Sequence, residues 1–254
     1  MKRVDLNSDM GELPEAIADG TQEALMLSLT SVNVACGGHA GDAATMKTTV
    51  EQAMRWKLAI GAHPGYPDRA NFGRLELELP LAEISKSVSE QVRALAGVAS
   101  ALGVRLTHVK PHGALYNQAV HNRPLAQAIA EGVARWSRDV VLVGLAESPM
   151  LDVFREAGFA VAAEAFADRR YEPDGTLRSR RFADALICDP AEAARQALSI
   201  VEGGRVTAQN GTSVALSAQT LCIHGDTPGA PRIAAEVARR LREAGVALKP
   251  LLAD

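Results

Sequence analysis

The sequence predicts an α/β fold built on parallel strands. Short apolar runs, many of them β-branched, alternate along the 254 residues with longer segments of helical period. Strands that alternate with helices pair in parallel through crossover connections. No Ser/Pro-rich tract, low-complexity run or internal repeat divides the chain, so we expect one domain over residues 1–254. A closed or nearly closed (β/α) barrel and an open doubly wound sheet both fit this pattern.

Seven runs are the predicted strands. Each run is short and mainly apolar, as expected for strands that are buried on both faces of a parallel sheet. The runs are residues 4–6, 31–35, 58–62, 106–109, 140–143, 160–163 and 220–223.

Four helices carry the clearest signals. Asp42 is a good N-cap for the first, which continues with apolar residues at helical spacing. The second covers residues 81–102 and has one apolar face. The third begins at Asp189 and Pro190, a cap followed by proline at the first helical position. The last covers roughly residues 231–244, before a glycine that can end it.

The composition excludes several classes of protein. Apolar residues make up 47% of the chain, which allows a full core without disulfides. The net charge is −3 with both signs intermixed, so we expect neither a nucleic acid nor a membrane as partner. Three cysteines at scattered spacings suit a reducing compartment. There is no signal-peptide pattern and no apolar run near the roughly 20 residues of a membrane span, which predicts a cytoplasmic protein.

Polar and glycine-rich segments follow most of the predicted strands. In parallel α/β folds the loops after the strands converge on one face, and ligands bind there. Any one of these polar residues has an ordinary structural explanation, but their shared position predicts a functional site. Lys110 is the hardest to explain otherwise, since a lysine that ends a buried strand must find an acid or an anion or lose its proton.

The residue types at these strand ends suit a divalent metal. Aspartate with two or more histidines, and without Cys-x-x-Cys spacing, is a mixed oxygen and nitrogen ligand set for zinc, manganese, nickel or a similar ion. The candidate ligands are Asp9, His39 and His63, which follow the first three strands. The alternative is a metal-free site, in which histidines and carboxylates serve as acid, base and hydrogen-bond donors.

Nucleotide-binding motifs are weak. The segment 41–48 misses a phosphate-binding loop of the G-x-x-x-x-G-K-[ST] type because Met46 replaces the second glycine, whose backbone must wrap the phosphates. No G-x-G-x-x-G follows a strand. The motifs therefore support no independent ATP site in this chain.

Seven segments together resemble the LamB/YcsF family. They match it in order over nearly the whole chain, at DLNSDMGE (5–12), VNVACGGHAGD (32–42), GAHPGYPD (61–68), FGR (72–74), VKPHGALYN (109–117), EAFADRRY (164–171) and CIHGDTPGA (222–230). Ser8 stands where the family usually has cysteine, Leu75 where it usually has a second arginine, and residues 181–185 where it tends to have a Pro-Gly-Ala stretch. These departures concern substrate preference more than reaction class.

The resemblance implies a (β/α) barrel of the glycoside hydrolase/deacetylase type, which we expect to be seven-stranded and imperfectly closed. It implies a hydrolase that opens the cyclic amide 5-oxoproline to L-glutamate with ATP, together with PxpB-like and PxpC-like partner subunits. A homo-oligomer is compatible with it. In the deacetylase relatives one aspartate and two histidines hold a divalent metal, and Asp9, His39 and His63 match that set by role.

The implied reaction suggests roles for the candidate residues. A lactam is a resonance-stabilised amide, so its carbonyl needs polarisation by a Lewis acid or prior phosphorylation of its oxygen. We expect Lys110 and Arg169 to bind anionic groups, such as the substrate carboxylate or a phosphorylated intermediate. Asp9 or His112 would be the general base for water, and His224 with Asp226 would complete the pocket. The substrate-binding candidates are Asn7, Asn33, Asp68, Arg74, Tyr116, Glu164, Asp168, Arg169 and Asp226.

Two other functions fit the same residues. One is a stand-alone metal-dependent deacetylase or amidohydrolase that acts on a small amide or amino sugar without ATP or partners; the low aromatic content, 4%, argues mildly against a polysaccharide cleft. The other is a non-catalytic binding protein that has kept the pocket.

Overall fold

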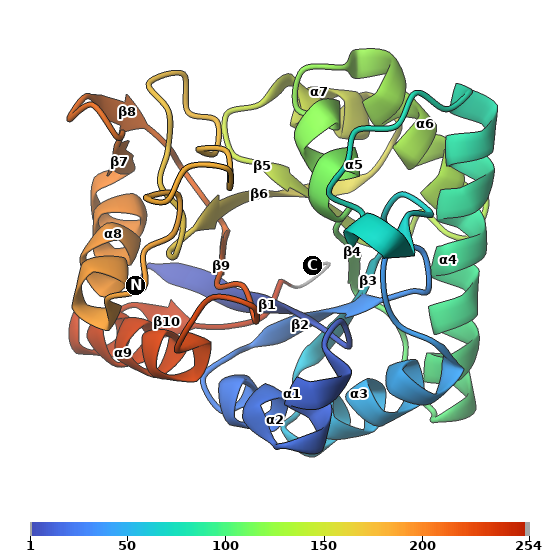
Figure 1. The fold of residues 1–254 in the computed structure, drawn as a ribbon, viewed down its shortest axis with the longest axis horizontal. Coiled ribbons are helices and arrows are strands. Elements are labelled where there is room, and N and C mark those ends of the chain that lie inside the picture. The colour runs from blue at the N-terminus through green and yellow to red at the C-terminus, as the bar shows by residue number, and fades with distance from the viewer. Residues whose placement is uncertain (1, 252–254) are drawn as a thin grey trace.

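Seven parallel strands form a closed ring in the computed structural model, which describes residues 2–251 (Figure 1). In ring order the strands are β1 (Arg3–Met10), β2 (Ser31–Ala35), β3 (Ala59–His63), β4 (His108–Val109), β5 (Val141–Leu145), β6 (Ala160–Phe166) and β9 (Thr220–Cys222). Every pairing in the ring is parallel, and β9 pairs with both β6 and β1.

The predicted seven-stranded parallel barrel is confirmed, and the open doubly wound sheet is excluded. The expected imperfect closure is wrong, because Thr220 of β9 stands in register with Asp5 of β1 on one side and Glu164 of β6 on the other. The predicted strand positions hold, although β4 covers only residues 108–109 of the predicted 106–109, β6 extends to residue 166, and β1 is longer than expected. It continues through Asn7 and Asp9, since polar side chains belong inside this barrel.

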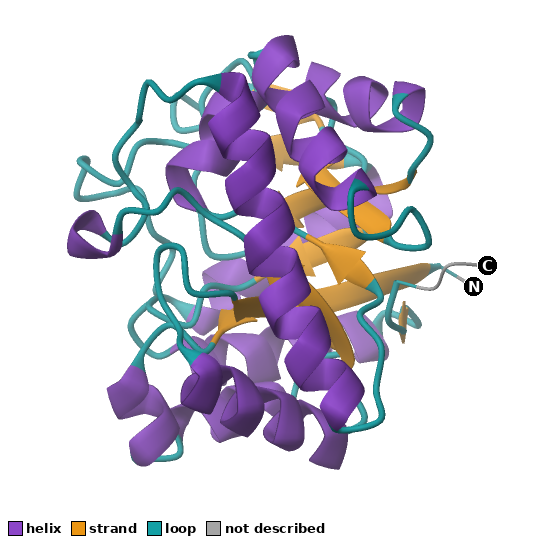
Figure 2. Cartoon of the chain, turned by 90° about the vertical axis from the view of Figure 1, so that its right-hand side faces the viewer, coloured by secondary structure: helices purple, strands orange, loops and turns teal. Residues whose placement is uncertain are grey.

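Helices surround the ring and occupy the outside of the strands (Figure 2). The helices are α1 (Pro14–Ala18), α2 (Thr21–Met26), α3 (Ala43–Arg55), α4 (Leu81–Ala101), α5 (Gly113–Ala119), α6 (Arg123–Ala134), α7 (Pro149–Glu156), α8 (Pro190–Gly203) and α9 (Ala230–Glu243), with the 3-10 turn η1 (Arg69–Asn71). The four predicted helices are α3, α4, α8 and α9. Asp42 caps α3 and Asp189 caps α8 through side-chain hydrogen bonds, as their sequence positions predict.

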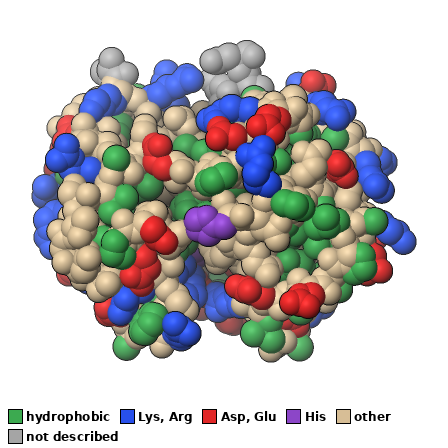
Figure 3. Space-filling view, turned by 90° about the horizontal axis from the view of Figure 1, so that it is seen from above, with side chains coloured by type: hydrophobic (Ala, Val, Ile, Leu, Met, Phe, Trp, Pro, Cys, Tyr) green, Lys and Arg blue, Asp and Glu red, His purple; other side chains and the backbone are tan. Residues whose placement is uncertain are grey.

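Three short strands lie outside the ring. β7 (Arg205–Thr207) and β8 (Ser213–Ala215) make an antiparallel hairpin, and β10 (Ala247–Leu248) pairs with the start of β1. No helix among residues 2–251 is both long and apolar enough to span a membrane. On one face of the molecule basic and acidic side chains are interspersed, as the sequence predicts (Figure 3).

The two faces of β1 separate an apolar layer from a polar interior. Val4, Leu6 and Met10 belong to the apolar core that packs strands against helices. The alternating residues Asp5, Asn7 and Asp9 make hydrogen bonds across the inside of the ring. At the floor of the barrel a small apolar cluster replaces them, formed by Val141, Val143 and Ala162 with Leu251 packed against it.

Asp5 holds together the strands near the floor. Its carboxylate accepts hydrogen bonds from the hydroxyls of Thr30 (2.6 Å), Ser31 (2.8 Å) and Thr220 (2.5 Å). Burial raises the pKa of Asp5 to about 6, although the three hydroxyls oppose that shift. Ionising this buried carboxyl near neutral pH therefore costs the folded state free energy.

We expect the free energy of unfolding to depend on Asp5 between pH 5 and 7.5. Because the folded pKa lies above the unfolded one, the folded state holds the extra proton at low pH, and this stabilisation is lost as pH rises through about 6. The wild-type protein should lose about 1 kcal/mol over this range relative to Asp5→Asn, measured by urea unfolding at both pH values. An equal pH dependence of the two proteins would contradict this.

Candidate active site

A cavity of about 670 Å³ opens at the carboxyl ends of the ring strands. Its floor is formed by residues at or just after those ends, including Asp9, His63, Lys110, Phe166 and His224. Its walls come from the loops that follow β3, β6 and β9 and from α5. The volume is in the range of enzyme pockets for small ligands, and the lining mixes charged and apolar side chains.

Lys110 is the central charge of the site. It is only 3% exposed, and its Nζ lies 3.0 Å from Asp9 Oδ1, 3.0 Å from Glu164 Oε1 and 3.1 Å from Cys222 Sγ. Burial would lower its pKa, but Asp9, Cys222 and Glu164 outweigh burial and raise the pKa well above its ordinary value. Lys110 therefore keeps its charge. Of the two outcomes expected for a lysine that ends a buried strand, it has found acidic partners.

Asp9 keeps its negative charge because cationic side chains surround it, just as acidic side chains surround Lys110. Its Oδ1 accepts hydrogen bonds from Lys110 and from Asn33 Nδ2 (2.8 Å), and its Oδ2 lies 3.3 Å from His63 Nε2. Burial would raise its pKa, but His63 and Lys110 lower it well below the ordinary value. Asp9 is consequently a weak base.

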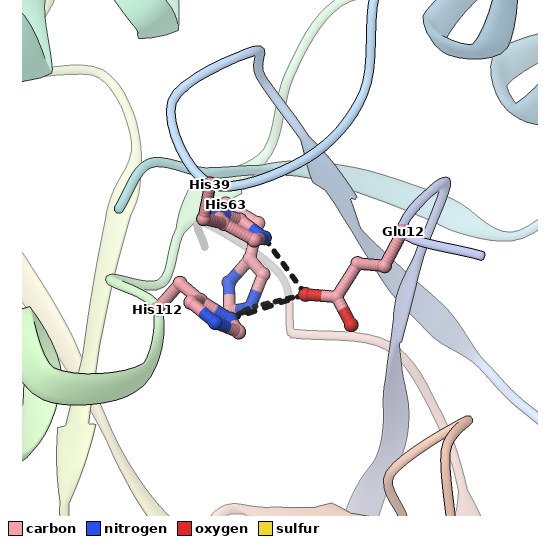
Figure 4. A group of neighbouring side chains, drawn as sticks. All are labelled: Glu12, His39, His63 and His112. Atoms are coloured by element: carbon pink, nitrogen blue, oxygen red, sulfur yellow. Dashed lines mark hydrogen bonds and ion pairs between the residues drawn. The ribbon is translucent and has the colours of Figure 1, made fainter. Parts of the chain in front are cut away.

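Three histidines and Glu12 form a cluster beside Asp9 (Figure 4). Glu12 Oε1 lies 2.8 Å from His39 Nε2, 3.1 Å from His112 Nδ1 and 3.6 Å from His63 Nε2. The rings of His39 and His112 stack at 3.6 Å. The close packing of these rings needs a glycine at position 73. Gly73 has a φ of +63°, and a Cβ at this position would lie 2.7 Å from His39 Cβ.

Backbone carbonyls fix the tautomers of two of these rings. His63 Nδ1 donates to Lys110 O (2.8 Å) and His112 Nε2 donates to Phe72 O (2.9 Å), because a carbonyl can only accept. In the neutral rings the other two nitrogens, 2.9 Å apart, would point lone pairs at each other. A shared proton or a bound cation removes this repulsion.

The cluster suits a divalent cation. Three imidazole nitrogens and one carboxylate are a ligand set for a catalytic zinc or similar ion, and two of the rings have the carbonyl partners that orient metal-binding histidines. Burial lowers the pKa of His39 to about 4, so this ring stays neutral, as a ligand must be. Burial would also lower the pKa of His63, but Asp9 and Glu12 raise it.

The predicted metal trio is only partly brought together. His39 and His63 lie in the cluster, whereas Asp9 lies beside it, bound to Lys110. Glu12 and His112 occupy the remaining places. From the sequence, Glu12 was visible after the first strand but had no assigned role. The feature that could have identified it is its position as a carboxylate just beyond the inward-facing Asp9. A second group, Asp9, Cys222 and His224, is a poor cation site because the Lys110 ammonium stands against two of its members.

His224 is oriented by Asp168. Its Nδ1 lies 3.1 Å from the Asp168 carboxylate, which also accepts the His224 backbone N–H (3.0 Å) and the Thr227 hydroxyl (2.6 Å). Burial would raise the pKa of Asp168, but His224 and Thr227 lower it to about 2. Asp168 therefore holds the Nδ1–H of His224, whose ring stacks on Phe166 and lines the cavity.

Some predicted substrate-binding residues line the cavity and others support it. Arg74, Tyr116, Arg169 and Asp226 line it, together with the predicted catalytic residues Asp9, Lys110, His112 and His224.

The other five differ from the prediction, because their side chains are engaged elsewhere. Asn7, Asn33 and Glu164 lie beneath the cavity in the hydrogen-bond network of the barrel, and Asp168 stands behind His224. Asp68 caps η1 through the backbone N–H of Asn71.

Two arginines meet one aspartate at the cavity wall. Arg74 lies 2.5 Å from Asp226, and Arg180 donates two hydrogen bonds to the same carboxylate at 3.0 and 3.2 Å. These contacts join the loops after β3, β6 and β9. Arg180 is not among the residues predicted from the sequence, although it lies in a basic run at residues 178–181.

Comparisons with known proteins agree on one family. The profile of the LamB/YcsF family matches residues 4–253. A 5-oxoprolinase subunit from Chloroflexus aggregans is 50% identical over 98% of this chain and 99% of its own, and one from Pyrococcus horikoshii is 45% identical over 98% of each. The crystal structure of a lactam utilization protein from Thermus thermophilus superposes with a TM-score of 0.90, at 41% identity over 98% of this chain and all of the other.

A more distant structure shares the fold alone. A family 4 carbohydrate esterase from Streptomyces lividans has a TM-score of 0.53 and is 12% identical, over 97% of this chain and 91% of the other.

Removing the buried cation should destabilise the fold. Lys110→Met leaves the Asp9 and Glu164 carboxylates without their common partner, and we expect a loss of about 3 kcal/mol in the free energy of unfolding. The control is Lys86→Met, since Lys86 pairs with Glu90 on the surface and should cost less than about 0.5 kcal/mol. If urea unfolding gave the same small loss of unfolding free energy for both variants, the buried ion pairs would stabilise the fold no more than the surface pair does.

The histidine cluster should bind one divalent cation. We expect calorimetric titration with Zn²⁺ to give one ion per wild-type chain and binding at least about tenfold weaker in Glu12→Gln and His112→Ala. His121→Ala is the control, because His121 is exposed and lies outside the cluster. Unchanged affinity in the two cluster variants would leave the shared proton as the explanation of the geometry.

Proposed function

This chain belongs to the LamB/YcsF family, and we propose that it is a PxpA-like component of a 5-oxoprolinase. In this function the lactam ring of 5-oxoproline is opened to L-glutamate with hydrolysis of ATP, together with PxpB-like and PxpC-like partner subunits. The observation that carries the proposal is full-length identity of 43–50% to relatives that are named as 5-oxoprolinase subunits, combined with a cavity whose floor holds a fixed cation among proton-transfer groups.

The chemistry needs a polarised carbonyl and a route for one proton. Water adds to the lactam carbonyl carbon, the carbon–nitrogen bond breaks, and the ring nitrogen leaves as an amine that takes a proton. Amide resonance makes the carbon a poor electrophile, so developing negative charge on the oxygen must be stabilised. Transfer of a phosphoryl group from ATP to this oxygen would also make the carbonyl carbon a better electrophile. This is the step for which ATP would be used.

Lys110 is the group we assign to charge stabilisation. It lines the cavity floor and stays protonated, so it offers a positive charge that needs no rearrangement during the reaction. Its two carboxylate partners hold it in place. If the cluster of Glu12, His39, His63 and His112 holds a divalent ion, that ion would add Lewis-acid chemistry at the same end of the cavity.

His224 is the group we assign to proton transfer. Asp168 holds its Nδ1–H, which leaves Nε2 free to accept a proton from water and return it to the leaving nitrogen. Asp9 is less suitable as the base, because its pKa is lowered well below the ordinary value and Oδ1 already accepts two hydrogen bonds. His112 shares its Nδ1 with His63 and Glu12.

We infer that the use of ATP depends on partner subunits, because the sequence lacks a nucleotide-binding motif. It carries no complete phosphate-binding loop, so we propose that ATP acts in concert with the partner subunits. A second candidate is a stand-alone metal-dependent deacetylase, and the observation that favours it is the histidine–carboxylate cluster.

A reconstituted assay separates the two functions. We expect purified chain, 5-oxoproline and ATP to give glutamate only when both partner subunits are present, with His224→Gln lowering the rate at least about 100-fold. Acetate release from a small N-acetyl compound by the chain with Zn²⁺ alone would favour the second candidate. Glutamate formation without ATP would contradict the proposed role of phosphate.

A further inference from the structure

His108 is a buried histidine that the proposed chemistry does not use. It lies on β4, is 1% exposed, and stands in register beside Gly61 of β3, where a Cβ would overlap its ring. Both ring nitrogens have polar partners: Nε2 lies 2.8 Å from Asn33 Oδ1, and Nδ1 lies 2.8 Å from the hydroxyl of Thr107. The glycine therefore leaves the space in which this ring joins the polar network beneath the cavity.

The carboxylates of this network fix the direction of its two amide groups. Asp9 is ionised and can only accept, so Asn33 turns its Nδ2 toward Asp9 Oδ1 (2.8 Å) and its carbonyl oxygen toward His108. The same Nδ2 donates to Asn7 Oδ1 (2.8 Å), and Asn7 Nδ2 in turn donates to Glu164 Oε1 (3.1 Å). Each amide thus has its nitrogen against a carboxylate and its oxygen against a donor.

These contacts select one tautomer of His108. Because Asn33 presents a carbonyl oxygen, the ring must donate through Nε2. Burial, followed by the nearby Lys110, lowers the pKa of His108 to about 3, so the ring is neutral and its Nδ1 carries a lone pair. The Thr107 hydroxyl donates to that nitrogen at 2.8 Å, in preference to Ile60 O at 3.2 Å.

The hydrogen bonds therefore run in one direction, from His108 to the two carboxylates beside Lys110. Without a donor at position 108, the carbonyl oxygen of Asn33 would be buried without a partner, which is costly. A flipped Asn33 amide would instead bring its oxygen against two other acceptors, the side-chain oxygens of Asp9 and Asn7. Either change would disturb the carboxylates that hold the ammonium.

We propose that His108, with its ring hydrogen on Nε2, is a positioning residue that orients Asn33 and Asn7 so that Lys110 is held in its place on the cavity floor. It does not line the cavity and acts only through these other side chains. The inference rests on the proposed function, in which Lys110 stabilises charge on the lactam oxygen. A residue with this role should affect kcat much more than KM.

Spectroscopy on the wild-type protein tests the tautomer directly. With ¹⁵N-labelled histidine at neutral pH, we expect the signals of His108 to show hydrogen on Nε2 and none on Nδ1. His108→Gln identifies these signals by their loss. The exposed ring of His121 gives the comparison in the same spectrum, because its tautomers interchange in water. Hydrogen on Nδ1 of His108, alone or together with Nε2, would overturn the proposal.

A matched pair of variants separates positioning from packing. His108→Gln keeps an N–H donor near the place of Nε2, whereas His108→Leu has a similar size and no polar group. In the reconstituted assay we expect His108→Leu to lower kcat about 10- to 100-fold and to change KM less than about threefold. His108→Gln should retain kcat within about threefold of wild type. Equal losses in the two variants would assign His108 to packing and overturn the proposal.

The ammonium of Lys110 gives a readout that does not need turnover. Its ¹⁵Nζ signal, identified by its absence in Lys110→Arg, should be retained in His108→Gln and should shift or exchange faster with water in His108→Leu. The same signal in both variants would overturn the positioning role. The expected signals in a protein that forms no glutamate with its partners would support the positioning role and count against the proposed function.

Discussion

The buried cation of Lys110 is the interaction on which the centre of this barrel depends. Its ammonium lies 3.0 Å from carboxylates on β1 and β6, two strands that do not pair with each other in the ring. Without the lysine, Asp9 and Glu164 would be ionised groups in a medium that does not tolerate unpaired charge. With it, one net negative charge remains, and Asn33 and Asn7 donate hydrogen bonds to the same two carboxylates.

This arrangement differs from the usual filling of a parallel barrel. Such barrels pack branched apolar side chains in layers along their axis, whereas here the apolar layer is confined to the floor around Val141 and Val143. Above it lies a continuous polar network from Asp5 through Thr220 and Asn7 to Glu164. Hydrogen bonds are directional, so the network holds side chains at defined angles as well as at defined distances. A rigid hydrogen-bond network of this kind positions the side chains at the carboxyl ends of the strands.

Two kinds of group line the cavity above this network. Glu12 and three imidazoles converge in one cluster, and the orientation of His112 depends on the carbonyl of Phe72. Arginines of the loops after β3 and β6 also line the cavity. Arg74 follows Phe72 closely and binds Asp226, which also holds Arg180. The cavity wall and the histidine cluster are thus parts of one connected structure.

The sequence by itself determined the elements and the face on which the chemistry collects. Capping at Asp42 and Asp189, the apolar runs and the position of Lys110 after a buried strand depend on near neighbours in the chain, so they could be predicted from local pattern. Only the tertiary structure decided which side chains meet. Glu12 joins the histidines, while Asp68, equally close to a strand end, turns to cap η1. The partners of Lys110 come from β1, β6 and β9, which are distant from it in sequence, and no local pattern encodes those contacts.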